Sequence, residues 1–95
     1  MAQVELTLAA VEDLDRLIRT HSLPADTRQR VRGVLEPLRR FPELGAELAG
    51  RWAGKRFVLG PWRWMLLVYS YGRSTDRVVV LTVQDARSSR VATTT

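Results

Sequence analysis

The chain of 95 residues contains no cysteine and only one histidine. Without thiolates it forms no disulfide and none of the cysteine-rich sites that hold zinc, and the single imidazole of His21 is too little for a histidine metal site. The sequence therefore predicts a protein with no metal and no cofactor. Disulfides are characteristic of oxidising compartments, so a chain without cysteine fits a cytoplasmic location.

Several other signals are missing. The apolar runs are all far shorter than the roughly 20 residues of a membrane-spanning helix, and the N-terminal residues lack the basic-then-apolar pattern of a secretory signal. We therefore expect no membrane partner. Gly50 and Gly54 are too sparse for a nucleotide-binding glycine motif. A Ser-His-Asp triad would depend on His21, which we interpret as a solvent-exposed turn residue between two helices.

Acidic residues are scarce in the second half of the chain. Residues 1–48 carry seven arginines and eight carboxylates, whereas residues 49–95 carry eight basic residues and only Asp76 and Asp85, which gives net charges of −1 and +6. Fourteen of the fifteen basic residues are arginine. A basic half of this kind predicts an anionic partner, either a nucleic acid or an acidic protein segment.

The apolar pattern predicts a short strand, two helices and three further strands, in that order. Residues 4–8 alternate as a half-buried strand does, and two sets of apolar residues then recur at helical spacing. The first set is Leu8, Val11, Leu14, Leu17 and Ile18; the second is Val31, Val34, Leu35, Leu38 and Phe41. Pro37 lies within the second set and should kink that helix or end it early. Residues 57–59, 62–71 and 77–84 read as strands.

This order predicts an α+β domain over residues 1–87, with an α-hairpin packed on one face of a sheet of about four strands and a frayed tail at 88–95. In the 62–71 strand we assign the even positions, Trp62, Trp64, Leu66 and Val68, to the face that packs on the helices. Arg63 would then point away from the helices, between two tryptophans.

A set of basic residues remains as the candidate chemistry. It comprises Arg51, Lys55, Arg56, Arg63, Arg87 and Arg90. Such a set can bind a phosphodiester and stabilise the additional negative charge of its transition state. If the substrate is RNA, its own 2′-hydroxyl is the nucleophile, and Lys55 is a candidate for taking up its proton. Arg63 stands out, because a charge inside an otherwise apolar strand is costly without a purpose.

These residues resemble the RelE/ParE superfamily of small bacterial toxins from type II toxin–antitoxin modules, over roughly residues 4–87. The resemblance is carried by LEPLRRFPELGAELAG at 35–50, GKR at 54–56, GPWR at 60–63, Tyr69, and VVVL at 78–81 closing at Ala86 and Arg87. It implies a twisted, mostly antiparallel sheet with two helices on one face. It also implies a cognate antitoxin that docks through an acidic, amphipathic segment and folds as it binds.

The superfamily includes two activities. RelE-like members cleave messenger RNA in the ribosomal A site with scattered lysines and arginines, usually together with a C-terminal tyrosine or histidine; ParE-like members inhibit DNA gyrase. By position, Lys55 or Arg56, together with Arg63 and Arg87, would match the catalytic residues of the first group, with Arg51, Arg63 and Arg90 binding RNA. Only one of Lys55 and Arg56 can share a sheet face with Arg63.

The C-terminal tyrosine or histidine of the RelE-like group has no counterpart in residues 87–92. The leading hypothesis is a ribosome-dependent mRNA endoribonuclease. A ParE-like gyrase inhibitor without nuclease chemistry and a non-toxic basic interaction module are the alternatives.

Overall fold

The computed structural model describes residues 1–87, which form one sheet and one helical layer. The elements follow one another as β1 (Gln3–Leu6), α1 (Leu8–Thr20), α2 (Thr27–Leu35), the 3₁₀ helix η1 (Glu36–Arg39), β2 (Ala46–Glu47), the 3₁₀ helix η2 (Gly50–Trp52), β3 (Arg56–Leu59), β4 (Met65–Gly72) and β5 (Arg77–Asp85). Among the described residues, no helix has the length and apolar character needed to cross a membrane. The predicted tail at 88–95 lies outside the described residues.

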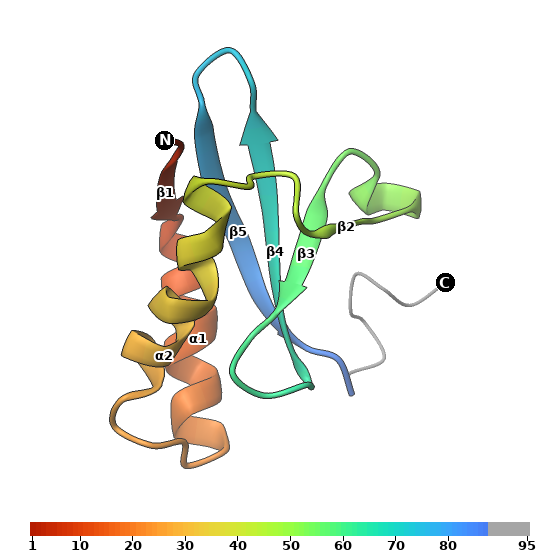
Figure 1. Ribbon diagram of the computed structural model, residues 1–95. Helices are drawn as coiled ribbons and strands as arrows, with labels where there is room; N and C mark the ends of the chain where they lie inside the picture. The colour runs from red at the N-terminus through yellow and green to blue at the C-terminus, as the bar shows by residue number, and fades with distance from the viewer. Residues whose placement is uncertain (88–95) are drawn as a thin grey trace.

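The sheet has five strands in the order β1-β5-β4-β3-β2. β1 pairs with β5 in parallel, and the other neighbours are antiparallel. Both helices lie on one side of this sheet (Figure 1). The predicted α+β architecture is therefore confirmed, but the expected number of about four strands was too low. The additional strand, β2, has two residues, too few to produce an alternating pattern in the sequence.

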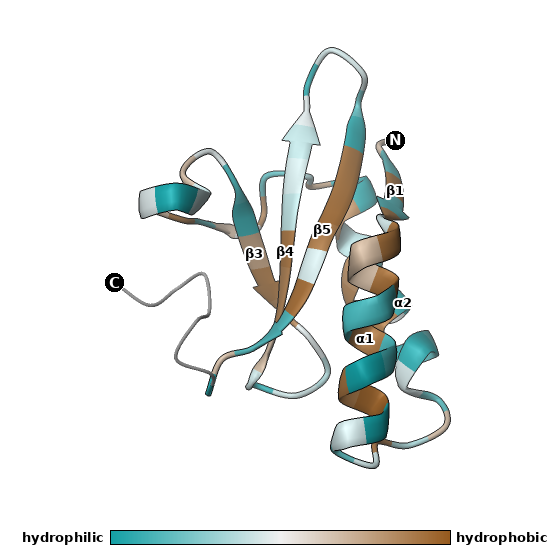
Figure 2. Cartoon of the chain, turned by 180° about the vertical axis from the view of Figure 1, so that it is seen from behind, coloured by the Kyte–Doolittle hydropathy of each residue, from teal (hydrophilic) through white to brown (hydrophobic). Residues whose placement is uncertain are grey.

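The helical layer follows its apolar spacing. Thr7 caps α1, because its hydroxyl accepts the backbone N–H of Ala10 at 3.1 Å. Leu14 and Leu17 of α1 are buried against the sheet, and Figure 2 shows hydrophobic residues alternating with hydrophilic ones along this helix. α2 ends at Leu35 and continues as a 3₁₀ turn that contains Pro37. The predicted early end at this proline is thus confirmed.

The face assignment of β4 was wrong. The odd positions Met65, Leu67 and Tyr69 are fully buried in the core between sheet and helices. The even-numbered Val68 instead packs on the opposite side, with Leu48, Trp52 and Phe57. Both faces of β4 are apolar, so period-two alternation alone did not show which face the helices cover.

A β-bulge changes the alternation of β5. Val68 pairs with Thr82 and Tyr69 pairs with Val80, so Leu81 is the additional residue. As a result the buried positions of β5 are Val78, Val80 and then Val83. The hydroxyl of Thr7 donates to the Leu81 carbonyl at 3.1 Å, which ties the start of α1 to the bulge.

Tyr69 holds the loop before β2 against the sheet, and we predict that Tyr69→Phe destabilises the protein by roughly 1–3 kcal/mol. Its buried hydroxyl donates to the Pro42 carbonyl at 2.8 Å and accepts the Gly45 N–H at 2.9 Å. Burial raises the pKa of this phenol, and phenylalanine would leave both backbone groups unpaired. Urea denaturation measures the change. Tyr71→Phe is the control, because that hydroxyl bonds Asp76 in an exposed position; a loss as large as that of Tyr69→Phe would contradict the prediction.

Candidate nucleic-acid interface

The segment at residues 60–64, which we call the tryptophan turn, joins β3 to β4. The Gly60 N–H donates to the Met65 carbonyl at 2.8 Å, and the Met65 N–H donates to the Trp62 carbonyl at 3.0 Å. Arg63 lies in this turn and not within a strand, contrary to the sequence prediction. Because the chain bends here, the side chain avoids the apolar sheet surface. It is exposed and forms no hydrogen bond or ion pair with any residue of the described range.

The end of β5 lies beside the tryptophan turn. Met65 pairs with Asp85, and the next residue of β5's extension, Ala86, donates its N–H to the Trp64 carbonyl at 2.6 Å. Arg63 precedes this contact by one residue and Arg87 follows it by one, so both predicted site residues, 24 positions apart in the sequence, lie at the same end of the sheet.

Arg87 is held in place by two neighbours. Its Nε and Nη2 donate to Oδ1 and Oδ2 of Asp85, both at 2.9 Å. Its guanidinium also lies 4.6 Å from the ring centroid of Trp64. The hydrogen bonds from Arg87 lower the pKa of the Asp85 carboxyl, and the same pairing raises the pKa of Arg87. Arg87 is thus oriented, but part of its charge is offset by the carboxylate.

His21 belongs to the same cluster: it lies in the predicted turn between the two helices, but it is half-buried and not fully solvent-exposed. Its Nε2 lies 3.4 Å from Oδ2 of Asp85, and its ring centroid lies 4.7 Å from that of Trp64. Its side chain is 29% exposed. The two partners follow it in the sequence by more than forty residues, so no local pattern could have found the contact. We call His21, Trp64, Asp85 and Arg87 the His21 cluster.

Trp62 extends the aromatic surface next to this cluster. Its ring stacks on that of Trp64 with centroids 6.2 Å apart, and the guanidinium of Arg30 on α2 lies 5.9 Å from its centroid. Both tryptophans are half-buried and also pack against the main core. They therefore connect the tryptophan turn to the helical layer. The sequence had predicted them as part of a strand.

Lys55 and Arg56 lie elsewhere. Arg56 begins β3 and Lys55 directly precedes it, whereas the tryptophan turn follows the other end of this strand, which is about 10 Å long. The Nη1 of Arg56 donates to the Gly45 carbonyl at 2.8 Å, and its Nη2 lies 3.1 Å from Oε1 of Glu47. Arg56 thus fastens the loop before β2 and is largely neutralised.

The side chains of Lys55 and Arg51 are less constrained by neighbouring groups than that of Arg56. Lys55 forms no side-chain hydrogen bond or ion pair with residues 1–87, and alternation along β3 directs it to the same side as Phe57. Arg51, on η2, lies with its guanidinium 5.8 Å from the Trp52 centroid. Arg90, the remaining predicted RNA-binding residue, lies outside the described residues.

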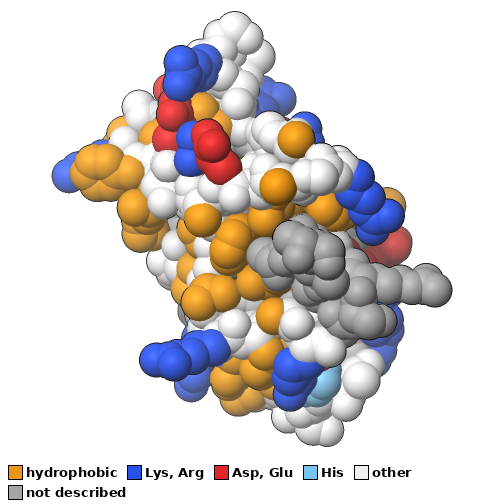
Figure 3. Space-filling model, turned by 90° about the vertical axis from the view of Figure 1, so that its right-hand side faces the viewer, with side chains coloured by type: hydrophobic (Ala, Val, Ile, Leu, Met, Phe, Trp, Pro, Cys, Tyr) orange, Lys and Arg blue, Asp and Glu red, His pale blue; other side chains and the backbone are white. Residues whose placement is uncertain are grey.

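The side of the sheet away from the helices, which we call the open face, is apolar with a basic margin. Its side chains are Leu48, Trp52, Phe57, Leu59, Leu66 and Val68. Figure 3 shows this side with hydrophobic side chains at the centre, basic side chains and some acidic ones around them, and a histidine beside basic side chains at the lower end. A surface of this kind fits an anionic partner that also carries apolar groups.

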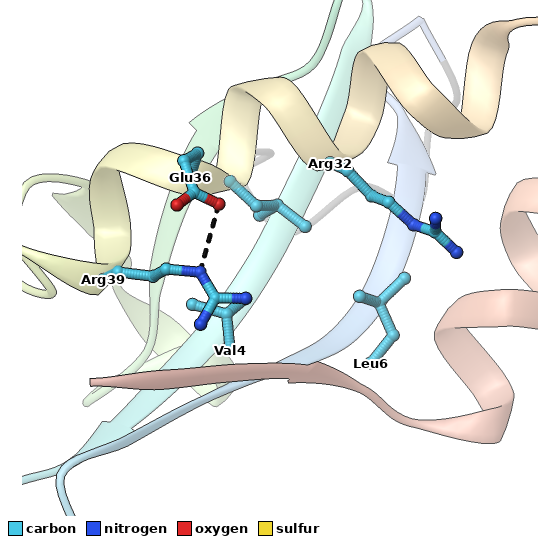
Figure 4. Close-up of a pocket in the computed structure, with 6 residues that line it drawn as sticks. Val4, Leu6, Arg32, Glu36 and Arg39 are labelled. Carbon is cyan, nitrogen blue, oxygen red and sulfur yellow. Dashed lines mark hydrogen bonds and ion pairs between the residues drawn. The ribbon is translucent and has the colours of Figure 1, made fainter. Parts of the chain in front are cut away.

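A groove on the helical side is a separate feature. It runs between β1 and α2, with Val4 and Leu6 projecting toward Arg32 and Arg39 (Figure 4). The Nε of Arg39 donates to Glu36 at 3.0 Å, which offsets its charge. The groove contains none of the predicted site residues, so the tryptophan turn and the His21 cluster remain the candidate site.

Several solved structures share the overall fold of this chain. A chain of the RelBE2 toxin–antitoxin complex from Mycobacterium tuberculosis is 26% identical, with 88% of this chain and 96% of that chain covered and a TM-score of 0.65. The chain has the fold of the RelE and ParE toxins. A chain of the chromosomal ParDE system of P. aeruginosa matches at 15% identity, 92% and 98% coverage and a TM-score of 0.69. The isolated RelE toxin of E. coli matches at 16% identity, 95% and 89% coverage and a TM-score of 0.65.

The likeness to RelE and ParE toxins is visible in the structure and not in sequence comparison. No family model matches the sequence, and no curated protein matches it either. The matches cover most of both chains, so the likeness extends over most of the domain.

The Asp85–Arg87 pair predicts a pH dependence of stability for this RelE/ParE fold. The Asp85 pKa is depressed below its usual 3.8 in the folded state, so the pair stabilises the protein above that pH, and this stabilisation is lost as pH falls through the folded-state pKa. Asp85→Asn should therefore lose less stability than the wild type between about pH 5 and pH 2. Urea midpoints across this range test it. Glu12→Gln is the control, and parallel pH curves for wild type and Asp85→Asn would refute the prediction.

Proposed function

We propose that this protein is the toxin component of a type II toxin–antitoxin module and acts as a ribosome-dependent mRNA endoribonuclease. The observation that carries the proposal is Arg63: an exposed guanidinium without a partner in residues 1–87, placed at the same sheet end as Arg87. An unpaired guanidinium on a rigid turn suits the binding of a phosphate, because its donors match two phosphate oxygens.

In this proposal the cations position the scissile phosphate and stabilise its transition state. Arg63 and Arg87 contact the phosphate, and the additional negative charge of the pentavalent state is shared between them. Lys55 and Arg51 extend the basic surface along an RNA strand, and Arg90 would add to it. Arg56 assists indirectly, because it holds the loop before β2. The RNA supplies its own 2′-hydroxyl as nucleophile, so positioning accounts for a large part of the rate.

A second candidate is a ParE-like inhibitor of DNA gyrase that has no chemistry of its own. Two of the four predicted catalytic cations, Arg56 and Arg87, are paired with carboxylates. Such pairing favours a binding surface over a strongly cationic active site. The apolar open face would then carry most of the affinity for the gyrase surface.

One induction experiment separates these functions. The chain is expressed alone from a tight promoter, and growth, mRNA 5′ ends and plasmid supercoiling are followed in the same culture. New 5′ ends at in-frame codons with normal supercoiling support the endoribonuclease. Lost supercoiling with intact mRNA supports the gyrase inhibitor and overturns the nuclease. Unchanged growth would indicate a non-toxic interaction module.

The expected partner is a cognate antitoxin with an acidic, amphipathic segment. The open face offers apolar contact at its centre, with basic side chains and some acidic ones around it (Figure 3). The apolar centre and the basic side chains complement such a segment. Two of the structurally similar systems are toxin–antitoxin complexes or systems. Co-expression with the product of a neighbouring short reading frame should restore growth and yield a co-purifying complex.

A further inference from the structure

The proposed function leaves one chemical role without a residue. Cations position a phosphate, but cleavage through the 2′-hydroxyl also requires a group that takes up its proton. Arginine stays protonated at neutral pH and cannot do this. Lys55 directly precedes β3, at the end of that strand opposite to the tryptophan turn that carries Arg63. The half-buried imidazole of His21 lies at the same sheet end as Arg63 and Arg87.

We propose that His21 is the general base of this protein, positioned by Asp85, and that it takes the proton from the 2′-hydroxyl of the RNA bound by Arg63 and Arg87. This inference rests on the proposed endoribonuclease function. Histidine is the side chain most often used for such transfer near neutral pH. Asp85 acts through His21 and is a positioning residue.

The contacts of His21 set the orientation that a base requires. Nε2 is the ring nitrogen nearest the Asp85 carboxylate, 3.4 Å from Oδ2, so the proposal assigns the proton to Nε2 and the lone pair to Nδ1. The Trp64 ring packs against the imidazole and limits its rotation. Within the described residues, the charged groups of this cluster are Asp85 and Arg87, both from the end of β5, and Trp64 is neutral.

The proposed step is balanced without any co-reactant other than water. Nδ1 of His21 accepts the 2′-hydroxyl proton while the 2′-oxygen forms a bond to phosphorus. The bond from phosphorus to the 5′-oxygen breaks, and that oxygen takes a proton from water. The imidazolium then returns its proton to the hydroxide left in solution. The products are a 2′,3′-cyclic phosphate and a 5′-hydroxyl end.

The position of the base also explains a gap in the sequence. The RelE-like tyrosine or histidine past the last strand has no counterpart at residues 87–92. His21 enters the site from the turn after α1, on the opposite side of the cluster from the end of β5. In this proposal the proton-accepting group is thus provided by the turn after α1, which packs against the same sheet end, and not by the segment that follows β5.

The test compares purified full-length variants in cleavage of mRNA on programmed ribosomes, read by primer extension. We expect His21→Ala to lower the single-turnover rate by about 10²–10⁴-fold and added imidazole to restore part of it. His21→Gln should also remove the limb of the wild-type pH–rate profile that reports the general base. Thr20→Ala, an exposed neighbour, is the matched control and should cleave as the wild type does.

The outcomes separate this inference from the function on which it rests. Wild-type cleavage together with an undiminished rate for His21→Gln, folded by circular dichroism, overturns the base and leaves the endoribonuclease intact. A slower His21→Ala with no imidazole rescue and an unchanged pH limb also overturns it, because the residue would then be structural. Absence of cleavage by the wild type overturns both.

Discussion

Arg63→Ala should abolish the growth arrest caused by the induced chain and lower mRNA cleavage by about 10²–10³-fold, without loss of stability. In the proposed function the Arg63 guanidinium contacts only the phosphate of the RNA. Removing this charge therefore directly reduces the stabilisation of the transition state. The fold should be unaffected, because the Arg63 side chain is exposed and bonded to nothing in residues 1–87. Primer extension on programmed ribosomes and thermal unfolding measure the two effects.

Two further variants give this prediction its control. Arg40→Ala removes another exposed arginine, on the helical side of the molecule, and should leave cleavage unchanged. Arg63→Lys keeps the charge but loses the two-pronged donor geometry, so it should recover only part of the rate. Full toxicity of Arg63→Ala would refute the role of this residue, and an equal loss in Arg40→Ala would show that net charge alone matters.

Gly45→Ala should destabilise the protein by about 3–5 kcal/mol, a large part of the stability of a domain of this size. A methyl group on Gly45 would lie 2.6 Å from the Phe57 carbonyl oxygen and 2.7 Å from the Tyr69 hydroxyl. Neither atom can move freely, because one is strand backbone and the other belongs to a fully buried ring. The loop would have to shift and lose its hydrogen bond to Tyr69.

Gly33→Ala is the matched control for this substitution. Gly33 lies within α2, where an added methyl group meets nothing within 4 Å. Alanine is the better helix former, so this change should stabilise the protein by roughly 0.5–1 kcal/mol. Chemical denaturation of the two variants should therefore move in opposite directions. A Gly45→Ala midpoint equal to that of the wild type would show that the loop is loosely held.

Local patterns predicted the elements well where a single physical rule governs them. The spacing of Leu14 and Leu17 gave α1, and the missing backbone donor of Pro37 gave the end of α2 and its 3₁₀ turn. The order of helices and strands then restricted the architecture to an α+β domain. These rules act between residues close in the sequence, so the sequence alone is sufficient for them.

The same rules failed where both faces of a strand are apolar and where the residues in contact are far apart in the sequence. Alternation in β4 did not identify the face that the helices cover, because Leu66 and Val68 are as apolar as Met65 and Leu67. Arg63 was assigned to a strand because the tryptophans beside it have high strand propensity. The structure places all three in a turn, since the hydrogen bonds of Gly60 and Met65 close the chain there.

The candidate site divides in the same way. The residue types and the basic second half of the chain predicted an anionic partner, and they named Arg63 and Arg87. Pairing of β4 with β5 then decided that these two residues share one end of the sheet, and the ion pairs of Arg56 removed it from the free cations.

The sequence by itself determined the two helices and the main strands, the charge asymmetry and the absence of thiolate chemistry, because these depend on composition and on neighbours within a few residues. Only the tertiary structure decided that His21 meets Asp85 and Trp64, because that contact joins the turn after α1 to the far end of the sheet. A lone histidine carries no pattern, and its chemistry depends on the groups that folding brings to it.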